Sequence, residues 1–215
     1  MKKFLVLLLM TPLVFTLAGT VHASMLQNGS FEEGLNFWTQ VAPGSGDIQV
    51  VTGYGPVDPW TGRHYDPVDG SYFALLTPGA AGVNTLLSQQ IDLIKGDVLS
   101  GAAFFDSNDS AQNNDAASIS LYKGSTFISY LWYSDVDGTG PFNDSAWQAW
   151  SYELAEDGTY QIMLSVVNAN SDLNDSLAGF DAIAVNAVPE PATMLLLGSG
   201  LLGLAGFGRR KFSRK

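Results

Sequence analysis

The residues best suited to chemistry in this chain gather in one loop, which runs from Gly53 to Gly70. Aromatic rings stack on the apolar faces of sugars, while charged and polar groups hydrogen-bond the sugar hydroxyls. The loop carries both kinds of side chain. The predicted stacking residues are Trp60 and Tyr65, and their predicted polar partners are Arg63, His64 and Asp66.

A second set of aromatic residues, Trp132, Tyr133 and Phe142, lies near an acidic loop and offers an alternative platform for a sugar. For each ring taken alone, burial in the core or closure of a sheet edge is the competing interpretation, because aromatic rings carry large apolar surfaces. The sequence therefore predicts sugar binding by one of these two aromatic sets.

The elements that must position these residues have the period of β-structure. Short runs of alternating apolar and polar residues are separated by clusters of Gly, Asn, Asp and Ser, and no run keeps a helical period. The expected strands are 48–52, 72–77, 86–93, 98–105, 118–123, 127–133, 147–154, 160–167 and 177–186. About nine or ten strands in one domain predict an all-β fold, a two-sheet antiparallel sandwich of the jelly-roll type.

Two of these strands are expected to be neighbours. In 160–167 every second residue from Tyr160 to Val166 is apolar, so one face should pack and the other should be solvated. The turn signal Glu-Asp-Gly-Thr at 156–159 comes just before this strand. The sequence therefore predicts an antiparallel hairpin between 147–154 and 160–167.

Both ends of the chain have the composition of targeting segments. Lys2 and Lys3 precede an apolar stretch, and small residues end at Ala23, which predicts a signal peptide, 1–23, that signal peptidase removes. Near the other end, 192–208 has no ionisable side chain and is long enough for a transmembrane helix. Because the basic tail 209–215 should stay in the cytoplasm, the predicted sandwich domain, 24–187, should lie outside the inner membrane.

The C-terminal segment 188–215 resembles the PEP-CTERM sorting signal of Gram-negative bacteria. It has the three parts of that signal: the residues Pro189, Glu190 and Pro191, a Gly-rich apolar helix and a terminal basic cluster. The resemblance implies that an exosortase-type membrane enzyme recognises the Pro-Glu-Pro region and removes the helix. The body would then reach the cell surface or extracellular matrix, in a system associated with exopolysaccharide production. A plain membrane anchor is the alternative, with the same orientation and no processing.

The charge of the chain excludes one class of partner. It has 10 basic and 21 acidic residues, a formal net charge of −11, and seven of the basic residues lie in the two targeting segments. The body keeps only Arg63, Lys95 and Lys123, so nucleic-acid binding is not expected, because it requires cations that displace counterions. The acidic surface either attracts divalent cations or simply keeps the protein soluble. The chain has no cysteine, which excludes thiol catalysis and disulfides.

The body resembles galactose-binding-like carbohydrate modules at three places. Residues 26–38, with Asn-Gly-Ser-Phe-Glu and a following Gly and Trp, are similar to their opening strand. Residues 69–75 (Asp-Gly-Ser-Tyr-Phe-Ala-Leu) and 179–185 (Gly-Phe-Asp-Ala-Ile-Ala-Val) are similar to an internal and the closing strand. The resemblance implies the jelly-roll fold more than any particular ligand, since this fold serves many functions.

The same resemblance implies a structural calcium ion. In that family Ca²⁺ commonly joins the first and last strands, and by position its side-chain ligands here would be Glu32 and Asp181, with carbonyls near Ser30 and Ser71. Two carboxylates suit an ion that takes six to eight oxygens. The family often has a second acid beside the closing Asp, where this chain has Ala182. Otherwise Glu32 would be an exposed strand-end residue and Asp181 a turn or ladder residue.

Catalysis has little support. Three acidic loops, 106–115, 135–138 and 172–175, are expected to be solvated turns, because Asp, Asn, Ser and Gly favour turns. His64 is the only histidine left after the signal peptide, and no Gly-x-Ser-x-Gly motif occurs. The leading expectation is a non-enzymatic, exported surface protein with a polysaccharide partner. A structural surface or biofilm protein without a sugar ligand and a surface hydrolase are the alternatives.

Overall fold

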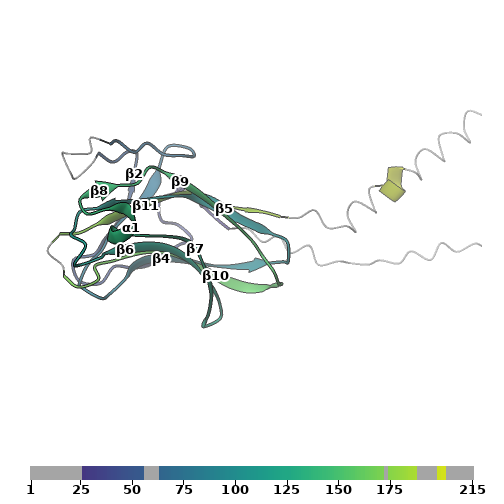
Figure 1. The fold of residues 1–215 in the computed structure, drawn as a ribbon. Helices are drawn as coiled ribbons and strands as arrows, with labels where there is room; N and C mark the ends of the chain where they lie inside the picture. Colours follow the sequence, from purple (N-terminus) through teal and green to yellow (C-terminus); the bar gives the residue numbers. More distant parts are fainter. Residues whose placement is uncertain (1–25, 56–62, 172–173, 188–197, 202–215) are drawn as a thin grey trace, which may run out of the picture. The chain divides into compact units, whose positions relative to one another are not determined.

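The computed structural model describes residues 26–55, 63–171, 174–187 and 198–201 (Figure 1). The described residues from 26 to 187 belong to one compact unit, Ala23–Pro189. The predicted signal peptide with Ala23, the Pro-Glu-Pro residues 189–191 and the stacking candidate Trp60 all lie outside the described residues.

Of the predicted membrane span 192–208, only residues 198–201 are described, and these are helical. Among the helices of the described ranges, none is both long enough and apolar enough to span a bilayer.

The first sheet has five strands in the order β1, β4, β10, β6 and β7, and every neighbouring pair is antiparallel. The bounds are β1 Thr39–Val41, β4 Thr85–Leu93, β10 Gly158–Val167, β6 Ala116–Lys123 and β7 Thr126–Asp135. Its central strand β10 is the strand whose apolar alternation is the most regular in the sequence. The first sheet therefore forms around the strand with the strongest pattern.

The second sheet has six strands, and its neighbours are also antiparallel. The path runs β2, β3, β11, β5 and β8, and β9 also pairs with β5. The bounds are β2 Asp47–Val51, β3 Phe73–Thr77, β11 Leu177–Asn186, β5 Val98–Ser107, β8 Asn143–Asp144 and β9 Gln148–Glu153. A single turn of helix, α1 Val136–Thr139, connects β7 to β8. The predicted all-β, two-sheet antiparallel jelly-roll sandwich is confirmed.

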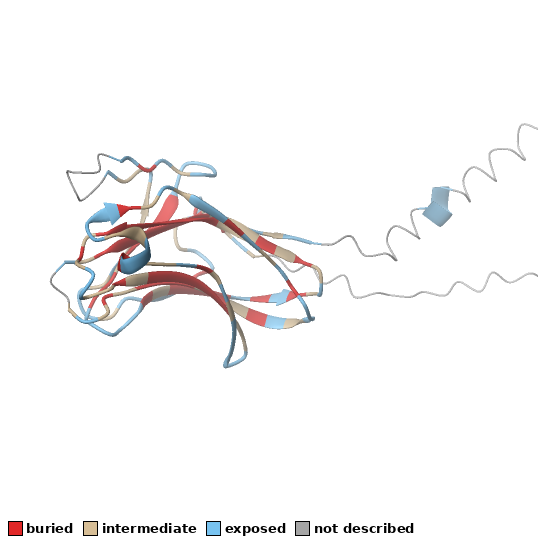
Figure 2. Ribbon diagram, in the orientation of Figure 1, coloured by how far each residue is buried: buried red, intermediate tan, exposed pale blue. Residues whose placement is uncertain are grey.

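The two sheets bury their apolar faces against each other, as the period-2 alternation predicts. In β10 the side chains of Tyr160, Ile162, Leu164 and Val166 are at most 4 % exposed and belong to the main core cluster. Figure 2 shows the buried residues following the strands of both layers. The core therefore lies between the sheets and fixes which side chains face outward.

A second, smaller cluster covers part of the outer side of the second sheet. Tyr65, Phe73, Leu75, Phe104 and Leu177 form it, and all are buried. Phe73 and Leu75 alternate along β3 with Ala74 and Leu76, which belong to the main core. The outer side of this sheet is thus closed by the segment that carries Tyr65.

The predicted hairpin between 147–154 and 160–167 is wrong. β9 pairs with β5 in the second sheet, whereas β10 pairs with β4 and β6 in the first. The segment 154–157 therefore carries the chain from one sheet to the other, and the last two residues of the predicted turn, 158 and 159, begin β10. The residues of this segment indicate where the chain reverses, and the partner of each strand is decided by core packing instead.

The prediction that the acidic loop 106–115 is a solvated turn is also wrong. Asp106, Asp109 and Asp115 are at most 1 % exposed. Asp115 accepts hydrogen bonds from the Ala169 N–H and the Ser176 hydroxyl, at 3.0 and 2.9 Å, and burial raises its pKa. Asp115 therefore joins this loop to the segment around residues 169–176, and the polar composition of the loop did not predict the burial of its carboxylates.

Candidate functional site

The outer side of the first sheet carries hydroxyl groups at its centre. Ser118 and Ser120 alternate along β6 with core residues, Ser165 does so on β10, and Ser88 does so on β4. We call these four residues the serine floor. They are directed away from the core, yet they are only 3–9 % exposed. Larger side chains around them must therefore cover much of the floor.

Aromatic rings line one edge of the serine floor. Phe127, Tyr130 and Tyr133 of β7, here called the aromatic row, are 44 %, 54 % and 48 % exposed. The ring centroids of Phe127 and Tyr130 are 4.9 Å apart, and those of Tyr130 and Tyr133 are 5.3 Å apart. Tyr130 and Tyr133 pair across the ladder with Ser120 and Ser118, so the row borders the floor directly.

Two register shifts in the β6–β7 ladder place the three rings on one side. Tyr122 pairs with Phe127, Ser120 with Tyr130 and Ser118 with Tyr133, which leaves extra residues on β7 between these pairs. A β-bulge of this kind shifts the alternation by one residue. Rings spaced three residues apart therefore face the same way, although a regular strand would turn them to opposite sides.

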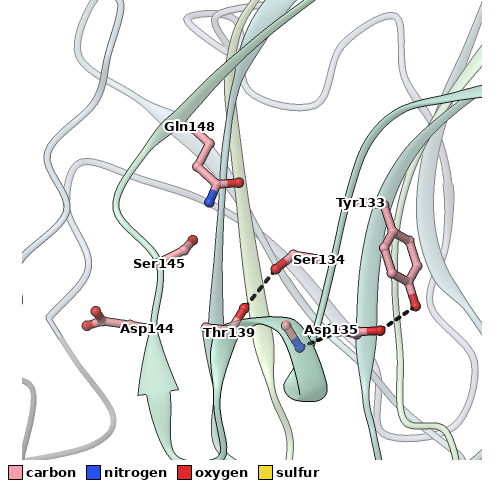
Figure 3. Close-up of a pocket in the computed structure, with 8 residues that line it drawn as sticks. Tyr133, Ser134, Asp135, Thr139, Asp144, Ser145 and Gln148 are labelled. Atoms are coloured by element: carbon pink, nitrogen blue, oxygen red, sulfur yellow. Dashed lines mark hydrogen bonds between the residues drawn. The ribbon is translucent and has the colours of Figure 1, made fainter.

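A recess lies at each end of the aromatic row. A hollow of about 270 Å³ is lined by Thr39, Ser88, Gln90, Gly124, Thr159, Tyr160 and Gln161. A pocket of about 450 Å³ is lined by Tyr133, Ser134, Asp135, Gly138, Thr139, Asp144, Ser145 and Gln148 (Figure 3). The hollow includes Gly124, in the turn before β7, and the pocket includes Tyr133. The aromatic row thus connects two recesses lined mainly by polar residues.

The wall of the pocket is held by hydrogen bonds that α1 organises. The Tyr133 hydroxyl donates to Asp135 Oδ2 at 3.0 Å, and Asp135 Oδ1 caps α1 by accepting from the Gly138 N–H at 2.8 Å. Burial, followed by this bond to Asp135, raises the pKa of Tyr133 to about 12. The Tyr133 hydroxyl therefore remains a protonated donor at neutral pH.

The predicted loop contacts the opposite wall of the same pocket instead of forming a stacking platform. Tyr65 is 1 % exposed, its ring centroid lies 3.6 Å from that of Phe104, and its hydroxyl donates to the Ser145 carbonyl at 2.6 Å. Burial raises the pKa of Tyr65. The prediction that Tyr65 offers its ring to a sugar is corrected, because apolar burial against Phe104 takes up the ring.

Arg63, like Tyr65, holds a residue of the pocket wall in position. Its Nε donates to Asp144 Oδ1 at 2.6 Å, which raises the pKa of Arg63, and the Asp144 side chain is only 2 % exposed. Asp144 and Ser145 both line the pocket, so Arg63 and Tyr65 hold the segment that carries them. His64 and Asp66 lie 3.4 Å apart and are largely exposed. The loop therefore shapes the pocket wall, and of its four predicted sugar-binding residues that the structure describes, His64 and Asp66 remain available on its surface.

We expect Arg63→Ala to destabilise the protein by about 2 kcal/mol, because Asp144 keeps its buried charge and loses its cation. Its other oxygen, Oδ2, has no hydrogen-bond partner among the described residues. In a domain of this size, the melting temperature should fall by about 4–8 °C. Adding Asp144→Asn should recover part of the loss, since a neutral amide is less costly to bury. An Arg63→Ala variant that melts like the wild type would contradict this role.

The alternative aromatic set is divided by the structure. Trp132 is 8 % exposed and its Nε1 donates to Gln148 Oε1 at 2.6 Å, so it belongs to the core. Tyr133 is in the aromatic row, and Phe142 is 51 % exposed in the segment between α1 and β8. The prediction therefore named one member of the row, and it missed Phe127 and Tyr130.

Sequence comparison decides what the C-terminal segment is. Residues 187–211 match the PEP-CTERM protein-sorting motif, which includes the Pro-Glu-Pro residues 189–191 and most of the apolar and basic stretch that follows. The chain carries a PEP-CTERM sorting signal. That motif implies export and a transient membrane association. No curated protein matches the chain.

Several solved structures are similar to this chain. TmCBM61, solved in complex with β-1,4-galactotriose, is 18 % identical, with 77 % of this chain and 99 % of that chain covered and a TM-score of 0.45. The K3 cleaved adhesin domain of Lys-gingipain from Porphyromonas gingivalis is 12 % identical, with 74 % and 97 % covered and a TM-score of 0.48. Tailspike protein 4 of bacteriophage CBA120 is 15 % identical, with 77 % of this chain but 21 % of that chain covered and a TM-score of 0.44.

The predicted calcium ligands lie at a different place in the sandwich, around residues 68–72. Asp181 is fully buried, and its Oδ2 accepts hydrogen bonds from the N–H groups of Val68 and Asp69 at 2.6 and 3.0 Å. Glu32 Oε1 accepts from the N–H groups of Ser71 and Tyr72 at 2.7 and 3.0 Å. The two carboxylates therefore bind successive parts of one loop.

Carboxylates are ligands that a hard cation prefers, and the contacts of these two in the described structure are to backbone N–H groups. Burial raises the pKa of Asp181, and the charge of Asp69 nearby adds to that rise. The Glu32 side chain lies against Gly70. Gly70 has a φ of +73°, which favours glycine, and a Cβ added at this position would overlap Glu32 Oε1. Among the described residues, no group of three or more acidic, His or Cys side chains gathers as a metal site. Backbone carbonyls, such as those near Ser30 and Ser71, would have to complete a calcium shell.

Proposed function

We propose that this PEP-CTERM protein is an exported, non-enzymatic surface protein that binds polysaccharide on the outer side of its first sheet. The observation that carries the proposal is the exposed aromatic row beside the serine floor. A pyranose ring has apolar faces and a rim of hydroxyl groups, so it needs rings to stack on and polar groups to bond. The aromatic row offers the first, and the floor with Gln90 and Gln161 offers the second.

The length of this surface supports a polymeric ligand. The aromatic row runs from the hollow at Gly124 to the pocket at Tyr133, so an extended chain that lies along it would contact both recesses. A polysaccharide matrix outside the cell is a partner of this shape, and the sorting motif supports export to that location.

Binding without cleavage is favoured by how the acids of the pocket are used. Glycoside hydrolysis requires two carboxyl groups that face each other across the bond to be cleaved. The Asp135 carboxylate accepts hydrogen bonds from the Tyr133 hydroxyl and from the backbone N–H that it caps in α1, and the Asp144 carboxylate is bound to Arg63. In Figure 3 the Asp144 carboxylate is directed away from Asp135. We therefore propose no catalytic step.

Processing and location complete the proposal. Signal peptidase would remove residues 1–23, and an exosortase-type enzyme would recognise residues 189–191 while the chain is held in the inner membrane. The protein would then remain at the cell surface or in the extracellular matrix of a Gram-negative bacterium. Mass spectrometry of the protein recovered from its native host tests this part, since trimming at both ends is expected.

Affinity electrophoresis tests the binding function. The protein is run through gels with and without exopolysaccharide isolated from the native host, and retardation by the polysaccharide is expected. Unchanged mobility in every polysaccharide tested would reject the proposal and favour a structural surface protein without a sugar ligand. Release of reducing ends from the polysaccharide would instead favour a hydrolase.

We also propose that Ca²⁺ bound by Glu32 and Asp181 stabilises the sandwich. Ligand present at about 100 times its Kd adds about 2.7 kcal/mol to the stability of the folded state. That gain corresponds to a melting temperature about 5–10 °C higher for a domain of this size. Thermal melting with Ca²⁺ and with a chelator measures the shift.

The control variants separate metal binding from the loop contacts. Glu32→Gln keeps an oxygen that can accept the Ser71 and Tyr72 hydrogen bonds but removes the charge, so it should abolish the calcium shift and change the metal-free stability little. Asp181→Asn should also abolish the shift. Equal melting temperatures with Ca²⁺ and with chelator in the wild type would reject the calcium proposal.

A further inference from the structure

The polysaccharide-binding surface is short of basic side chains. Of the three basic residues of the body, Arg63 is bound to Asp144, and Lys123 donates to Glu156 Oε2 at 3.2 Å and to the Asp157 carbonyl at 2.9 Å. Lys95 lies in the turn between β4 and β5. Among the described residues that line the hollow or the pocket, none is basic. An anionic ligand would find no cation there to replace its lost hydration.

Acidic side chains lie at both ends of the same surface. Asp92, on the outer side of β4, accepts a hydrogen bond from Thr159, which lines the hollow. At the other end Asp135 binds Tyr133, and Asp137 lies in α1. Carboxylates at both ends of this surface raise the negative potential there and repel anions that approach either end.

Between these acids, the groups that could contact a ligand are uncharged. They are the aromatic row, the serine floor and two amides, and some are already bonded in pairs: Ser118 with Ser165 at 3.0 Å, and Gln161 with Ser88 at 3.2 Å. Hydroxyl and amide groups both donate and accept, which matches sugar hydroxyls. Carboxylates and sulfates only accept, and donors with positive charge bind them more strongly than neutral hydroxyl and amide donors do.

We infer that this surface selects uncharged glycan chains and rejects polysaccharides that carry uronate, sulfate or phosphate groups. The inference rests on the proposed polysaccharide binding and names the chemical class of the ligand. The absence of cations and the flanking acids cause the selectivity, while the rings and hydroxyls supply the affinity.

The test compares one polymer in two charge states. A soluble β-glucan, a galactan and a mannan are each used before and after oxidation of their primary hydroxyls to carboxylates, and binding of the full chain is measured at low and high salt. We expect at least one neutral polymer to bind, and its oxidised form to bind about tenfold more weakly or worse at low salt. High salt should reduce the difference in affinity between the neutral and the oxidised polymer, because it screens the repulsion.

A charge variant makes the test specific to this surface. Gln90→Lys puts a cation into the hollow and should strengthen binding of the oxidised polymer severalfold, whereas Gln49→Lys, on β2 of the other sheet, should not. Equal or tighter binding of the oxidised form by the wild type would overturn the charge selectivity and leave polysaccharide binding standing. Failure of every polymer to bind in either form would reject both proposals.

Discussion

The variant Tyr130→Ala/Tyr133→Ala is expected to lose polysaccharide binding by on the order of 100-fold. These two rings are the members of the aromatic row that border the serine floor, and each is about half exposed. A sugar stacked on them would lose both contact surfaces at once, and the remaining hydroxyls are too polar to replace that contact. Affinity electrophoresis with the host polysaccharide, or calorimetry with a neutral polymer that binds, measures the loss.

Three controls separate recognition from folding. Because both rings are about half exposed and one hydrogen bond, from Tyr133 to Asp135, is lost, the double variant should melt within about 4 °C of the wild type. Tyr133→Phe keeps the ring and removes only the hydroxyl that donates to Asp135, so most of the binding should remain. Phe37→Ala removes a ring that is 56 % exposed outside the row, and binding should not change. A double variant that binds like the wild type would reject the aromatic row as the site.

The fold was predictable because the alternation of apolar and polar residues shows which face of each strand is buried. All nine expected strands are present, and their bounds differ from the observed ones by two residues or fewer. What the alternation lacks is the identity of the partner strand. The segment 156–159 has the composition of a hairpin turn, yet β9 and β10 are in different sheets. Strand pairing depends on contacts between distant residues, which a local pattern does not contain.

The candidate site was mostly missed, for two physical reasons. The aromatic row has a spacing of three residues, and only the bulges of β7 bring its rings to one side. The loop that looked most specialised uses Tyr65 and Arg63 for internal contacts, because a ring and a guanidinium can stabilise a loop as well as bind a ligand. One signal was available: Ser118 and Ser120 alternate with Ile119 and Leu121, which marks a polar outer face in the interior of a sheet.

The second large expected effect concerns Gly29, in the Asn-Gly-Ser-Phe-Glu segment near the start of the sandwich. Its carbonyl accepts a hydrogen bond from the Ile183 N–H at 3.0 Å, so this segment lies against the last strand, β11. A Cβ at position 29 would overlap the Ile183 carbonyl oxygen and press on the Leu26 side chain. The backbone atoms of Ile183 cannot rotate away as a flexible side chain could. The two segments must therefore separate if the residue is not glycine.

We expect Gly29→Ala to cost about 3 kcal/mol, from overpacking and the weakened hydrogen bond to Ile183, and to lower the melting temperature by about 6–12 °C. Gly34→Asn is the matched control, because Gly34 has a φ of +65°, which asparagine tolerates, and nothing lies within 4 Å of its added Cβ. It should melt close to the wild type. Since Glu32 and Asp181 belong to the same two segments, Gly29→Ala should also reduce any rise in melting temperature that Ca²⁺ causes. A Gly29→Ala variant that melts like the wild type would show that this contact contributes little to the stability of the sandwich.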